Sequence, residues 1–188
     1  FPGDPSGTPT QMIAHYIETV LLARCQYCLD LHSGGSSLEY VAHAHARRPG
    51  DAERRAATLA LIEAFGAPYG GLVKPLQGEP RTLSAAAERQ GVVYVNAELG
   101  GGGTISHELV VLAEAGVRRA LASVGVLPAD ALPRPAHGMR PFSVEGAANY
   151  VYCFEDGLFE PYARLEQDVM AAQPAGALHF PHTPWREE

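Results

Sequence analysis

Two short segments of the sequence place a chemically active side chain directly before glycine. LDLHSGG covers residues 29–35, and AELGGGG covers residues 97–103. Each follows or includes an apolar run typical of a buried strand, so His32 and Glu98 are expected at the carboxyl ends of two strands. Ligands of open α/β sheets bind at that edge, and glycine lets backbone amides approach a substrate closely. The two segments together predict one functional site.

Asp30 and His32 are expected to act as a pair. Side chains alternate along a strand, so residues two apart lie on the same side. An imidazole that binds a metal usually has its other nitrogen held by a carboxylate or a carbonyl group. Asp30 could therefore orient His32 as a metal ligand, or it could hold the loop that follows. The alternative is a hydrogen-bonded histidine at the end of a strand.

Glu98 lies in the apolar segment VVYVNAEL, where burying an unpaired carboxylate is costly. The residue therefore needs either a partner or a chemical task. The task would be that of a general base. The alternative is a structural salt bridge with an arginine.

His43 and His45 lie two residues apart in AHAHARR. On a strand they would share a face and could bind a metal. On a helix or at a loop tip they would be solvated, and this second interpretation is favoured.

The pattern along the chain predicts an α/β fold, because helical and strand-like segments alternate. Helices are expected at residues 9–23, 52–65, 82–91 and 106–125, strands at 27–31 and 92–99, and a loop at 66–80. A proline-rich linker at 127–138 precedes short β-like runs. These features predict an α/β catalytic domain at 1–134 and a partial β-rich domain at 140–188.

Composition excludes some classes of partner. The 188 residues carry a net charge of -7, and Lys74 is the only lysine. The absence of a basic stripe argues against a nucleic-acid partner, and the net charge argues against an anionic membrane surface. No apolar run in the sequence is long enough to span a bilayer. Three cysteines do not make an even disulfide framework, which favours a reducing, cytoplasmic setting.

LDLHSGGSSLEY, followed about seventy residues later by AELGGGG, resembles the succinylglutamate desuccinylase/aspartoacylase family. Within that family it resembles the N-acetyl-diaminobutyrate deacetylase type. FPGDPSGT near the start and EDGLFEPYARLEQDVMAAQPAG near the end strengthen the likeness. The resemblance implies a zinc-carboxypeptidase-like mixed sheet flanked by helices, with a small partial all-β C-terminal domain.

The resemblance also implies roles for individual residues. His32 matches one zinc ligand of the family, and Glu98 matches its catalytic glutamate. Asp30, from the strand alternation described above, would orient the His32 ring. The family's other two ligands form a His-x-x-Glu pair upstream of Phe-Pro-Gly, and this pair has no match here. HYIE at residues 15–18 has the right spacing but falls within an expected helix downstream of that loop. The chain is therefore expected to be truncated at both ends and inactive alone.

The implied reaction is hydrolysis of a linear amide in a small N-acyl amino acid, with acetyl as the expected acyl group. Zinc would activate the attacking water, and Glu98 would take its proton and pass it to the leaving amine. Homo-oligomers are compatible with this activity. A metallocarboxypeptidase acting on peptides and a metal-free scaffold protein remain alternatives. Substrate contacts are expected from the backbone amides of Ser33, Gly34, Gly35 and Ser36.

Overall fold

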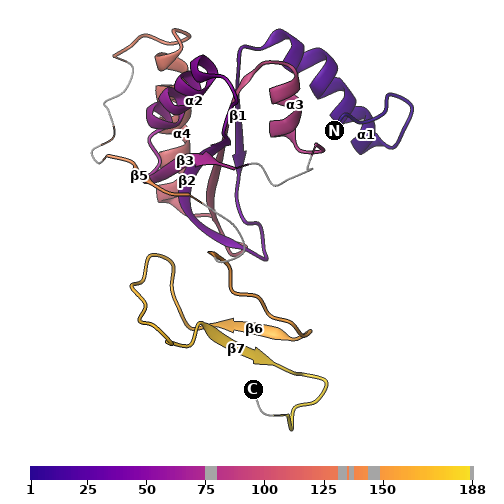
Figure 1. Cartoon of the computed structure of the whole chain (residues 1–188), viewed down its shortest axis with the longest axis vertical. Coiled ribbons are helices and arrows are strands. Elements are labelled where there is room, and N and C mark those ends of the chain that lie inside the picture. Colours follow the sequence, from indigo (N-terminus) through magenta and orange to yellow (C-terminus); the bar gives the residue numbers. More distant parts are fainter. Residues whose placement is uncertain (75–79, 131–134, 136–137, 144–148, 187–188) are drawn as a thin grey trace. The chain divides into compact units, whose positions relative to one another are not determined.

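The computed structural model describes residues 1–74, 80–130, 135, 138–143 and 149–186 (Figure 1). It divides into two compact units, Phe1–Val144 and Glu145–Glu188. The first unit holds a mixed sheet flanked by helices, as the sequence predicts. The functional candidates His32 and Glu98 both belong to this sheet.

The sheet of the first unit has five strands in the order β1-β4-β2-β3-β5. β4 is parallel to β1 and antiparallel to β2, while β2, β3 and β5 run parallel to one another. β4 therefore lies between the two strands that carry the candidate histidines. The strands are β1 (Tyr27–His32), β2 (Glu39–Arg47), β3 (Tyr69–Val73), β4 (Val93–Gly101) and β5 (Arg140–Pro141).

One face of the sheet is covered by α2 (Ala52–Phe65) and α4 (His107–Ser123), which lie side by side in Figure 1. Asp51 begins α2 by accepting a hydrogen bond from Arg54 N, and Gly66 ends it in the left-handed conformation. The core under these helices is apolar. Its buried residues are Ala44, Ala46, Leu61, Ile62, Phe65, Ala67, Val95, Ala97 and Ala120.

The opposite face meets α3 (Leu83–Arg89) and the segment that begins with α1 (Pro9–Tyr16). Thr8 and Gln11 form a capping box that begins α1. The predicted helix at 9–23 then continues as a π-helical turn, Ile17–Leu21, and a 3₁₀ turn, Leu22–Arg24. A second apolar cluster forms here. Its residues are Leu22, Ala86, Ala87 and Val92, with Phe1, Ile17, Cys28, Leu83 and Tyr94 packed against them.

Three sequence predictions are wrong in this unit. The segment with His43 and His45 is strand β2 rather than a solvated tip, because Ala44 and Ala46 pack into the core. Residues 69–73 of the expected loop form β3, where a Cβ on Gly70 would lie 2.3 Å from Met139 Sδ. β4 also continues through Gly101, because Gly100 and Gly101 pair with β2.

In the second unit, β6 (Leu158–Pro161) and β7 (Gly176–His179) form an antiparallel pair. Half of the proline-rich segment at 127–138 lies outside the described residues, and the domain boundaries at 134 and 140 stay predictions. Within the described part of the chain, no helix is both long and apolar enough to cross a membrane.

Candidate functional site

Three strands bring the candidate side chains into rows across one face of the sheet. His32 of β1 is the register partner of Glu98 of β4, and Glu98 is also the partner of His43 of β2. Two residues back along β4, Asn96 lies between Asp30 of β1 and His45 of β2. The intervening residues of these strands pack into the core of the opposite face, so alternation turns the polar residues away from α2 and α4.

A cavity of about 610 Å³ lies against this polar face. Its wall combines the two rows with residues from the first turn of α3 and from the N-terminal segment. The lining includes Asp30, His32, His45, Arg47, Ser84, Tyr94, Asn96 and Glu98. The sheet therefore delivers an imidazole from β1 and a carboxylate from β4 to one cavity.

Asp30 is held at both of its carboxylate oxygens. Oδ1 lies 2.8 Å from His32 Nε2, and Oδ2 accepts a hydrogen bond of 2.5 Å from the Tyr94 hydroxyl. Burial, with the Asp30 carboxylate as a further cause, raises the pKa of Tyr94, so its hydroxyl remains a donor at neutral pH. The His32 side chain is 53% exposed. With Nε2 facing Asp30, the Nδ1 atom of His32 is the nitrogen left to bind a metal or a substrate.

Glu98 is held by an amide rather than by an arginine. Asn96 Nδ2 donates a hydrogen bond of 3.0 Å to Glu98 Oε1. Glu98 Oε2 is buried and has no hydrogen-bond partner within the described residues. The salt bridge considered as an alternative for Glu98 is therefore absent from the described part of the chain.

His45 adds a neutral imidazole to the cavity wall. Burial lowers the pKa of His45 to about 4, and the neighbouring His43 contributes to this shift. The two rings stack with centroids 5.1 Å apart, and His43 Nδ1 lies 2.8 Å from Val41 O. Sequence reasoning missed Asn96 and Tyr94 as site residues, and it considered His45 as a metal ligand but favoured a solvated position for it. The signal for the first two was the even spacing of 94, 96 and 98, which places them on one face of a strand.

The glycine-containing loop after β1 is hydrogen-bonded to the end of β4 and to the loop that follows β4. Gly34 N donates to Gly100 O at 2.9 Å, and Gly103 N donates to Gly35 O at 2.8 Å. A Cβ on Gly34 would lie 2.2 Å from Leu38 O, so only glycine allows this approach. The Gly34 N–H is engaged within the fold, and a substrate contact by the Gly34 amide stays a prediction. The Gly35 N–H lies 3.4 Å from Ser33 Oγ, and roles for Ser33, Gly35 and Ser36 stay predictions.

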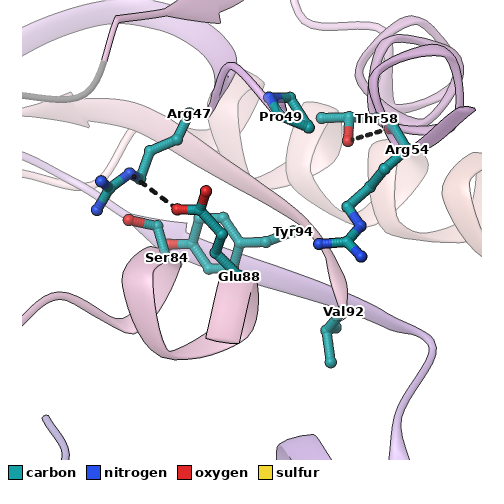
Figure 2. Close-up of a pocket in the computed structure, with 8 residues that line it drawn as sticks. All are labelled: Arg47, Pro49, Arg54, Thr58, Ser84, Glu88, Val92 and Tyr94. Atoms are coloured by element: carbon teal, nitrogen blue, oxygen red, sulfur yellow. Dashed lines mark hydrogen bonds and ion pairs between the residues drawn. The ribbon is translucent and has the colours of Figure 1, made fainter. Parts of the chain in front are cut away.

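At the other end of the cavity, Arg47 Nε lies 3.6 Å from Glu88 Oε2. Figure 2 shows these two side chains facing each other, with Ser84 and Tyr94 beside them. The small adjoining cavity of about 30 Å³ is also lined by Arg54 and Thr58. This ion pair links β2 to α3. Arg47, Ser84 and Tyr94 line both cavities.

Among the described residues of the site, His32 has the surroundings expected of a metal ligand. His32 has the supporting carboxylate typical of a metal-binding imidazole. Across the residues that the structure describes, no group of three or more His, Cys, Asp or Glu side chains is arranged to hold a metal ion. HYIE at 15–18 does not supply the missing pair, because Glu18 is engaged by Arg89 at 2.8 Å. This result agrees with the sequence, which offers no match for the His-x-x-Glu pair.

Comparisons with known proteins identify relatives of this chain. Residues 1–124 match the model of the succinylglutamate desuccinylase/aspartoacylase catalytic domain. The chain is 36% identical to the N-alpha-acetyl-L-2,4-diaminobutyric acid deacetylase of Halomonas elongata over 173 residues, covering 92% of this chain and 50% of that relative.

Two solved structures are similar over most of the chain. One is a succinylglutamate desuccinylase/aspartoacylase from Rhodobacter sphaeroides, with a TM-score of 0.86 and 34% identity over 97% of this chain and 54% of that one. The other is the product-bound ectoine utilization protein EutE (DoeB) from Ruegeria pomeroyi, with a TM-score of 0.78 and 34% identity over 87% of this chain and 49% of that one. The chain spans about half the length of these relatives. It belongs to the succinylglutamate desuccinylase/aspartoacylase family.

Proposed function

We propose that the protein carrying this chain hydrolyses the linear amide bond of a small N-acyl amino acid, with acetyl as the acyl group. The observation that carries the proposal is the pairing of His32 and Glu98 on adjacent strands at one cavity. The relative from Halomonas elongata, named as a deacetylase of an N-acetylated amino acid, supports the choice of substrate class.

In this reaction Glu98 is the general base. It takes a proton from the attacking water and delivers it to the nitrogen of the leaving amine. His32 would be one ligand of a zinc ion, and Asp30 holds the His32 ring at Nε2, which leaves Nδ1 as the nitrogen that would bind the metal. Zinc, when bound, lowers the pKa of a bound water and polarises the amide carbonyl. The remaining zinc ligands would come from outside the described residues.

A second candidate is a metal-free binding or scaffold protein. The absence of a three-ligand group from the described residues favours it. For the chain alone, zinc titration measures whether it binds the metal, and circular dichroism measures whether it is folded. The two measurements together distinguish the candidates. A folded chain that binds no zinc would be a scaffold by itself, whereas the proposed function requires zinc to bind in the full-length protein.

The test is a substrate panel with the full-length, zinc-loaded protein. The panel contains N-acetyl-2,4-diaminobutyrate, N-acetylaspartate, N-succinylglutamate and a peptide substrate for carboxypeptidases. Release of free amine is measured. We expect hydrolysis of at least one N-acyl amino acid and no hydrolysis of the peptide. Hydrolysis of the peptide alone would make the protein a metallocarboxypeptidase, and a zinc-loaded protein inactive on all four would contradict the proposal.

A further inference from the structure

The half-buried Glu98 receives one side-chain hydrogen bond among the residues that the structure describes. Asn96 Nδ2 donates it to Oε1 at 3.0 Å, while Oε2 has no partner among those residues. A buried carboxylate without a donor would be strongly disfavoured. The two oxygens of Glu98 are therefore in different environments, although they are chemically equivalent.

The orientation of the Asn96 amide is fixed by its partner. An ionised carboxylate only accepts hydrogen bonds, so the NH₂ end of Asn96 must face Glu98. The side chain is 8% exposed, and it lies two residues from Glu98 on the same face of β4. The donor is therefore built into the same rigid strand as the carboxylate, between the strands β1 and β2.

The neighbours of Asn96 do not replace this donor. Both oxygens of Asp30 are engaged by His32 and Tyr94, and Asp30 offers no proton to Glu98 when ionised. His45 Nδ1 is buried without a hydrogen-bond partner among the described residues, and no hydrogen bond from His45 reaches Glu98 there. Without Asn96, the carboxylate could turn about its terminal torsion, which has a broad two-fold profile.

We propose that Asn96 is a positioning residue that holds Glu98 by Oε1 and so fixes the orientation from which the carboxylate accepts the proton of the attacking water. The proposal rests on the proposed function, in which Glu98 is the base. The proton moves from the water to the Glu98 carboxylate and later from that carboxyl group to the leaving nitrogen, so Glu98 returns to its ionised form. Asn96 takes part in neither transfer.

The test uses Asn96→Asp in the full-length, zinc-loaded protein. This variant keeps the shape of the side chain but replaces the donor with an acceptor. We expect kcat to fall roughly 100-fold, as expected for a misplaced catalytic group, while KM and zinc content stay within about threefold. Asn96→Leu, which lacks the amide, should lower kcat in the same direction. A merely structural role predicts lower thermal stability in both variants, with kcat of the folded protein unchanged.

Thr58→Val is the matched control, because Thr58 is a buried polar residue of α2 whose hydroxyl donates to Arg54 O. It should lower thermal stability without lowering kcat. The proposal fails if Asn96→Asp keeps kcat within about threefold of the wild type, or if zinc content falls together with kcat.

A crystallographic measurement does not depend on turnover. Structures of the wild type and Asn96→Leu should show one orientation of the Glu98 carboxylate in the wild type and loss of that orientation in the variant. An unchanged Glu98 carboxylate would overturn the positioning role. This outcome is distinct from failure of the proposed function, which would appear as an inactive wild-type protein.

Discussion

The Asp30 carboxylate connects the hydroxyl of Tyr94 to the imidazole of His32. A supporting carboxylate fixes the ring of a metal-binding histidine, and its own hydrogen bonds fix the carboxylate. The sequence allowed this role for Asp30, because residues 30 and 32 share a face of any strand. The spacing of residues 94 and 98 places Tyr94 on the face of Glu98, but it could not reveal the contact with Asp30, since that contact joins residues that are 64 positions apart.

Tyr94→Phe tests this connection. The variant removes the hydroxyl that donates to Asp30 and keeps the ring that packs in the second apolar cluster. We expect zinc affinity in the full-length protein to fall roughly tenfold or more, as when other hydrogen-bonded groups that support a metal ligand are removed. Competition with a chromophoric chelator measures it. Tyr27→Phe is the control, because Tyr27 is 43% exposed and lies on the other side of β1. Equal affinities for both variants would contradict the role of Tyr94.

At the scale of the elements, the π-helical turn after α1 is joined to α3 by a partly buried ion pair. Arg89 donates to both carboxylate oxygens of Glu18, at 2.8 and 2.9 Å. The hydrogen bond from Arg89 lowers the pKa of Glu18 below its ordinary value of 4.5, against the opposing effect of burial. This pair supports the wall of the cavity formed by Ile17 and Leu83.

Glu18→Gln should therefore change stability in a pH-dependent way. Because the folded pKa of Glu18 is lowered, its contribution is present above pH 4.5 and is lost as the pH falls through the folded value. We expect the variant to lose about 1–3 kcal/mol of unfolding free energy at pH 7, a range that allows for solvent screening of Arg89. The difference should shrink in acid.

Urea unfolding at pH 7 and at acid pH measures this effect. Glu114→Gln is the matched control, because Glu114 forms an exposed pair with Arg118 on α4. Its effect should stay below about 0.5 kcal/mol. A Glu18→Gln penalty that is the same at both pH values would show that the ion pair contributes no stability.

Sequence patterns predicted the elements with regular periodicity and missed those with unusual residues. The four helices and the strands β1 and β4 follow apolar spacing and capping residues. β2 was missed because histidine alternates with alanine there, and the small alanines gave a weak apolar signal. β3 was missed because Gly70 and Gly71 suggest a turn, whereas a Cβ on Gly71 would lie 2.4 Å from Phe142 O, so glycine makes room for that carbonyl. These close approaches depend on tertiary packing.

At the scale of the whole molecule, the two compact units differ in what they contribute. Phe1–Val144 contains every residue placed at the cavity, and Glu145–Glu188 contains the β6–β7 pair. The chain spans about half the length of its relatives, and the described residues contain one candidate zinc ligand rather than three. A cytoplasmic location and a homo-oligomeric state stay predictions.

The central claim is that His32 binds the metal while Glu98 moves the proton. Zinc content and turnover, measured on the same preparation of full-length Glu98→Gln, test it most directly. Glutamine can still accept the hydrogen bond from Asn96, so the variant removes the base and keeps the packing. We expect a full complement of zinc with turnover reduced roughly 100-fold or more. Loss of zinc from this variant would make Glu98 a ligand and contradict its role as the base.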